Sequence, residues 1–147
     1  MQNGKPAVIA FATLAVLVMP AIAAGQDFKV VINDSNTKPS ISTEDLSRCF
    51  LKQTSTWING VPVIPVDQSS NSDTRTAFSQ EVHGRDVSSI KSYWQRQIFS
   101  GRGVPPTEKT SDEEVLEFVR SNPGAIGYVS VNADLGAGVK VLNIVDR

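Results

Sequence analysis

Residues 61–78, VPVIPVDQSSNSDTRTAF, contain the signals that decide the fold. The β-branched run from Val61 to Val66 predicts a strand, and the polar run from Asp67 to Ser72 predicts a loop. An amphipathic helix follows, with Ser72 as its N-cap. A strand, a short polar loop and a helix in this order form the repeating unit of α/β folds.

The ends of this unit carry further signals. Gly84 is the predicted stop of the helix, whose apolar face consists of Ala77, Phe78 and Val82. Pro62 and Pro65 lack a backbone N–H donor, so the strand is expected at an edge of the sheet or to be short.

The same alternation continues on both sides of this unit. The other predicted elements are strands at Phe28–Asn33, Ala125–Val131 and Val139–Val145, and helices at Thr43–Leu51, at Val87–Phe99 and from Ser111 to Asn122. Ser42 and Ser111 are the predicted N-caps of the first and last of these helices. Strands that alternate with helices predict a three-layer α/β fold with a small, mostly parallel sheet covered on both faces.

The N-terminal segment has the pattern of a secretory signal peptide, expected at residues 1–24. Lys5 precedes the apolar run Ala7–Met19, and small residues surround a cleavage site after Ala23 or Ala24. A membrane anchor is the alternative, but a spanning helix needs about 20 apolar residues and this run is shorter. The chain is therefore expected to be exported to the periplasm.

The remainder, residues 25–147, is long enough for one ordinary hydrophobic core and is expected to form a single domain. Without Lys5 it has 13 basic and 15 acidic residues, a net charge near −2. No basic cluster is visible along the sequence, so neither a nucleic-acid partner nor an anionic-membrane surface is expected.

Residue types that carry chemistry are scarce. Cys49 cannot form an internal disulfide alone and falls on an apolar helical stripe, so we expect it to be buried. His83 is the only histidine, which excludes a multi-histidine metal site, and a partly charged imidazole would suit its place at a helix C-terminus. No nucleophile motif, paired carboxylates or cofactor-binding loop is present, so no enzyme activity and no cofactor are expected.

Three segments resemble the phosphate-specific solute-binding proteins of bacterial ABC importers. Residues Ile41–Lys52 with Trp57 are similar to that family's S-x-E-x-L-x-x-I-F-x-G-K-x-x-x-W stretch, Val63–Phe78 is similar to its strand–loop–helix, and Pro123–Val129 reads PGAIGYV as in the family. The resemblance implies a lobe similar to one domain of a type II periplasmic binding protein. Full members clamp their ligand between two lobes, and this chain resembles the second lobe.

The resemblance also implies a ligand loop. The family's loop reads roughly Arg-Ser-Asp-Gly-Ser-Gly-Thr, and the corresponding run here is Gln68–Thr74, with Gln68 at the arginine position and Asn71 and Asp73 at the glycines. Backbone N–H groups and hydroxyls at a helix start bind phosphate oxygens. The implied oxyanion ligands are Ser69, Ser70, Ser72 and Thr74, assisted by Arg75 and Arg102. An ordinary capped helix start remains the alternative.

Two functions are therefore expected. The first is a non-catalytic periplasmic binding module for phosphate or another small oxyanion, which would work with an ABC permease. The second is a protein-interaction or sensory adaptor that keeps the fold without the ligand, with a partner surface around Trp57 or Phe99. A homodimer that rebuilds a two-sided cleft is a further possibility.

Overall fold

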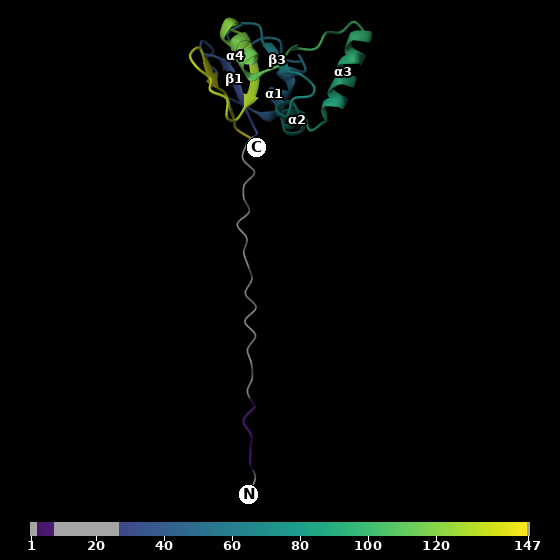
Figure 1. Cartoon of the computed structure of the whole chain (residues 1–147). Helices are drawn as coiled ribbons and strands as arrows, with labels where there is room; N and C mark the ends of the chain where they lie inside the picture. The colour runs from purple at the N-terminus through teal and green to yellow at the C-terminus, as the bar shows by residue number, and fades with distance from the viewer. Residues whose placement is uncertain (1–2, 8–26, 147) are drawn as a thin grey trace.

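The computed structural model describes residues 3–7 and 27–146 (Figure 1). The predicted signal peptide lies outside the described residues except for residues 3–7, and its cleavage site lies wholly outside them. Both therefore stay predictions.

A five-stranded sheet forms the centre of the structure, in the order β4-β3-β5-β1-β6. β3 pairs in parallel with β4 and β5, whereas β1 is antiparallel to both β5 and β6. Four of these five strands therefore run in one direction, which confirms the predicted, mostly parallel sheet. The strands are β1 (Phe28–Asn33), β3 (Ile64–Gln68), β4 (Thr107–Lys109), β5 (Ala125–Ser130) and β6 (Val139–Val141).

A small second sheet joins two short strands, β2 (Ser40–Ile41) and β7 (Asn143–Ile144), which pair in parallel. The predicted strand at residues 139–145 is thus divided between β6 and β7 at Leu142, which is buried. The division lets one short segment pair with β1 and then with β2.

The helices begin at side-chain caps. The Oγ atoms of Ser42, Ser72 and Ser111 each accept a hydrogen bond from the backbone N–H three residues on, which confirms these predicted N-caps. Gly84 ends the second helical segment with a φ of 62°, as predicted. The helical segments are α1 (Thr43–Phe50), α2 (Asp73–Phe78), the π-helix η1 (Ser79–His83), α3 (Val87–Phe99) and α4 (Asp112–Ser121).

The sheet is the middle one of three layers (Figure 1). One of its faces packs against α4, in a cluster that includes Val31, Val66, Val115, Val119 and Val129. The other face packs against α1, α2 and η1, in a cluster that includes Phe28, Leu46, Phe50, Phe78 and Tyr128. The predicted three-layer α/β fold is therefore confirmed.

The position of β3 decides between the two alternatives that its prolines allowed, an edge position or a short strand. The strand is short, as its prolines indicate, but it lies inside the sheet and not at its edge. Ile64 N donates to Gly124 O on the β5 side, so the nitrogen of Pro65 faces the β4 side. β4 pairs only from Val66 onward, and the missing donor of Pro65 therefore leaves no ladder partner unsatisfied.

The PGAIGYV segment, Pro123–Val129, allows close packing between neighbouring parts of the fold. A Cβ atom at Gly127 would lie 2.8 Å from methyl carbons of Val115 and Val66, so only glycine lets α4 approach the sheet this closely. A Cβ at Gly124 would lie 1.9 Å from Pro62 O, and Gly124 O accepts a hydrogen bond of 3.0 Å from Trp57 Nε1. The segment therefore holds the layers together.

Helix α3 extends beside the three layers and belongs to neither apolar cluster (Figure 1). Ile90 and Trp94 are buried, whereas Ile98 and Phe99 are 53% and 97% exposed. Tyr93 Oη donates a long hydrogen bond of 3.4 Å to Leu51 O. This helix is thus held to the body mainly through one of its sides.

Candidate functional site

The candidate site lies where β3 ends at Gln68 and α2 begins at Asp73. Ligands of open α/β sheets bind at the carboxyl ends of parallel strands, where such loops lie. β4 runs beside β3 and contributes Glu108 to the same region. The structure therefore brings two neighbouring strand ends and one helix start together.

Arg75 points back into this region and is only 4% exposed. Its Nη1 donates to Gln68 O and to Glu108 Oε1, each at 2.6 Å, and its Nη2 lies 3.5 Å from Asp67 Oδ2. Two carboxylates thus compensate the positive charge that was expected to assist anion binding. In this arrangement Arg75 acts as a structural cation.

Burial and pairing also set the protonation of this group. Burial raises the pKa of Asp67, although Arg75 and Tyr128 oppose the rise. Burial alone would lower the pKa of Arg75, but Asp67 and Glu108 hold it above its ordinary value. The pKa of Tyr128 is raised by burial and by Asp67, so its hydroxyl stays protonated and donates to Asp67 Oδ1.

Gln68 stands where the resembled family has arginine, and its buried side chain connects four segments. Its Nε2 donates to Tyr128 O at 3.0 Å and to Asp112 Oδ1 at 2.9 Å, and its Oε1 accepts from Ser72 Oγ at 2.6 Å. Sequence reasoning missed this role because two of the partners are far away along the chain. An amide both donates and accepts, so one side chain can bond the oxygens of Tyr128 and Asp112 and the hydroxyl of Ser72 at the same time.

The hydroxyls of the loop are mostly engaged. Ser72 Oγ caps α2 and donates to Gln68, and Ser69 Oγ donates to Asn71 Oδ1 at 2.7 Å. In contrast, the backbone N–H and hydroxyl of Thr74 and the backbone N–H of Asp73 have no hydrogen-bond partner in residues 3–7 and 27–146. These donors could meet a ligand, but the exposed carboxylate of Asp73 lies at the same helix start.

Ser70 borders an open hollow of about 400 Å³ between the loop and α3, called below the cavity beside Ser70. The cavity is lined by Ser70, Val87, Ser88, Lys91, Ser92 and Gln95. This lining combines three hydroxyls and one ammonium group with no carboxylate. Lys91 makes no ion pair within the described ranges, so its charge is uncompensated there. Sequence reasoning missed Lys91 because it is 21 positions beyond Ser70.

Arg102 lies apart from these residues, in the loop that follows α3. Its backbone N–H donates to Gln97 O, its side chain is exposed, and it does not line the cavity beside Ser70. Of the oxyanion ligands expected from the sequence, only Ser70 lines this cavity. Ser69, Ser72, Thr74 and Arg75 are its neighbours along the chain, and Arg102 lies apart.

The two remaining reactive residues lie elsewhere. Cys49 is 2% exposed, as expected, and burial raises the pKa of its thiol to about 11. His83 corrects an expectation, because burial, Arg85 and Arg75 lower its pKa from 6.5 to about 4 and keep it neutral. Its Nδ1 lies 2.7 Å from Ser47 Oγ, and this hydrogen bond replaces the expected interaction of a charged imidazole with the helix end.

Neither a family model nor a curated protein matches the sequence. Solved structures do match. A putative phosphate ABC transporter substrate-binding protein of Clostridium perfringens, solved with bound phosphate, is 18% identical with a TM-score of 0.62, over 80% of this chain and 44% of that chain. An ABC-type phosphate transport receptor of Vibrio cholerae is 20% identical with a TM-score of 0.62, over 79% of this chain and 45% of that chain.

A possible phosphate binding protein of Planctomyces limnophilus is 19% identical with a TM-score of 0.62, over 82% of this chain and 42% of its own. The resemblance expected from the three sequence segments is thus confirmed at the level of the fold. This chain spans less than half the length of these proteins. Within the described part of the chain, no helix has the length and apolar character needed to cross a membrane.

Proposed function

We propose that the protein is a non-catalytic, periplasmic binding module for a small oxyanion such as phosphate, and that it works with an ABC permease. The fold similarity to phosphate-binding components of ABC transporters supports this class of function. The described residues form one lobe in this proposal. The oxyanion would bind between the Ser69–Thr74 segment and α3.

The cavity beside Ser70 carries this proposal. Ser70, Ser88 and Ser92 supply hydroxyl donors, and Lys91 supplies an unpaired positive charge. The free N–H groups of the first turn of α2 lie in the neighbouring residues. Hydroxyls, amides and a cation without a carboxylate in the lining match the needs of a hydrated oxyanion. Lys91 thereby takes the role that sequence reasoning assigned to Arg75.

Calorimetric titration with phosphate and with sulfate tests the proposal. Lys91→Gln and Ser70→Ala should each weaken binding, the first by about tenfold or more because it removes a charge-assisted hydrogen bond. Lys140→Gln is the matched control, since it removes one positive charge from β6 and should leave the affinity unchanged. Equal weakening by both lysine variants would contradict the proposed site.

The second candidate is an interaction or sensory adaptor without a ligand. Its support is the compensation of Arg75 by Asp67 and Glu108, together with the carboxylate of Asp73 at the helix start. In that case millimolar phosphate and sulfate would cause neither heat change nor a shift of the melting temperature. Light scattering would then test whether the protein forms the homodimer considered in the sequence analysis. No observation in the described residues supports that homodimer.

A further inference from the structure

The end of α3 and the loop after it expose large apolar side chains. Phe99 is 97% exposed, Val104 61% and Ile98 53%. The loop folds back on the helix, because Gly101 N donates to Ile98 O and Arg102 N to Gln97 O. We call Arg96, Ile98, Phe99, Arg102 and Val104 the α3 tip.

Basic residues accompany this apolar group, and acidic residues are absent from it. Residues 87–107 contain Lys91, Arg96 and Arg102 but no aspartate or glutamate. None of the three forms an ion pair within the described ranges. The acidic residues of α4 lie in a separate part of the structure, away from α3 (Figure 1). The fold therefore places a basic surface apart from the acidic residues of α4, although the net charge of the whole chain is slightly negative.

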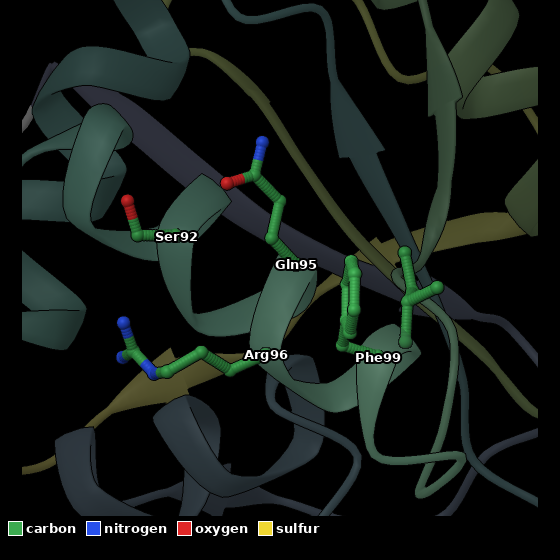
Figure 2. A pocket seen from close by; sticks show the side chains of 5 residues that line it. Ser92, Gln95, Arg96 and Phe99 are labelled. Atoms are coloured by element: carbon green, nitrogen blue, oxygen red, sulfur yellow. The ribbon is translucent and has the colours of Figure 1, made fainter.

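The two kinds of side chain lie together on the helix. Figure 2 shows Ser92 and Arg96 on one side of α3, with Phe99 near its end. A hollow of about 540 Å³ along this helix is lined by Ser92, Gln95, Arg96, Ile98 and Phe99. It is an open surface on one helix, so it suits a broad partner more than an enclosed ligand.

We propose that the α3 tip docks on an anionic lipid surface. Phe99 and Ile98 would enter the boundary between headgroups and acyl chains, where aromatic and aliphatic side chains gain from burial. Arg96 and Arg102 would stay at the level of the headgroup phosphates, with their aliphatic stems along the apolar layer. The proposal departs from the sequence analysis, in which no anionic-membrane surface was expected.

Cosedimentation with vesicles tests the proposal. The protein without residues 1–24, the predicted signal peptide, is mixed with vesicles of equal parts phosphatidylglycerol and phosphatidylcholine, and with vesicles of phosphatidylcholine alone. Binding should require phosphatidylglycerol and weaken between 0.1 and 0.5 M salt, by roughly tenfold or more. Phe99→Ala and the double change Arg96→Gln with Arg102→Gln should each reduce partitioning by about tenfold or more.

Matched controls separate the tip from general effects. Ile58 is 99% exposed in another loop, so Ile58→Ala removes an apolar side chain of equal exposure. Arg48→Gln with Lys140→Gln removes the same two charges from α1 and β6. Both controls should bind as the unchanged protein does.

Three results would overturn the proposal. One is the absence of binding to phosphatidylglycerol vesicles, and another is equal loss in the tip variants and in their controls. The third is concentration-dependent association of the protein in solution that Phe99→Ala abolishes, without any binding to lipid, because the tip would then be an interface between copies of the chain.

Discussion

At the level of single residues, burial sets the charge of His83. Removal of the imidazole from water lowers its pKa to about 4, and the neighbouring charges of Arg85 and Arg75 act in the same direction. In the unfolded chain the same group titrates near 6.5. Between these values the unfolded state binds the proton and the folded state does not, so the free energy of unfolding decreases as the pH falls from 6.5 to 4.

We therefore expect acidification over this interval to cost up to about 3 kcal/mol of stability through His83 alone. The test compares denaturant unfolding at several pH values for the unchanged protein and for His83→Asn, which retains an acceptor for Ser47. The variant should lose most of this pH dependence. The raised pKa of Asp67 makes its contribution to stability increase as the pH falls, opposite to that of His83. Asp67 is present in both proteins, so the difference between their pH curves isolates the effect of His83. Parallel pH curves would refute this explanation.

The roles of residues in the candidate site depend on contacts that the sequence did not predict. The run Gln68–Arg75 was expected at the site because it resembles the ligand loop of the phosphate-binding family, and the strand, loop and helix that carry it are local patterns of the sequence. The pairing of Arg75 with Glu108 depends on the position of β4, and the shared hollow of Lys91 and Ser70 depends on the position of α3 beside this loop. Contacts between residues far apart in sequence have no local signal, and so they were not predicted.

At the level of elements, the contact between α4 and the sheet depends on Gly127. A side chain there would collide with Val115 and Val66, which belong to a fully buried layer. We expect Gly127→Ala to lower the free energy of unfolding by about 1–3 kcal/mol, as overpacked cores do. Chemical denaturation measures the loss.

Gly103→Ala is the control for this change. A Cβ at Gly103 would lie 4.0 Å from the nearest atom, a ring carbon of Trp94, so the substitution should be close to neutral. Equal destabilisation by both changes would mean that close packing at Gly127 does not explain the effect.

The elements themselves were predicted to different degrees. α3 and β1 have the predicted bounds, because a capped amphipathic helix and a β-branched run are local patterns. β4 was missed, since Thr107–Lys109 is short and polar and becomes a strand only by pairing with β3. The π-helical turn η1 was also missed, because the apolar spacing of residues 77–82 is that of an ordinary helix.

At the level of the whole molecule, the two apolar clusters share one sheet, whereas α3 contributes to neither. Segments with few buried contacts open at lower free energy than the core. We expect α3 to unfold before the sheet. The variant Trp57→Phe leaves Trp94 as the only tryptophan and reports on α3, whereas Trp94→Phe leaves Trp57 and reports on the body. The fluorescence of Trp94 should change at a lower denaturant concentration than that of Trp57. Coincident transitions would show that α3 unfolds together with the body.

The sequence by itself determined the class of fold, most element positions and the loop that forms the candidate site. These features depend on hydrophobic periodicity, caps and turn residues, which act over a few neighbouring positions. Only the tertiary structure decided the interior place of β3, the compensation of Arg75, the cavity beside Lys91 and the exposed α3 tip. Each of these depends on which distant segments meet, and packing and charge pairing between such segments follow from the folded arrangement as a whole.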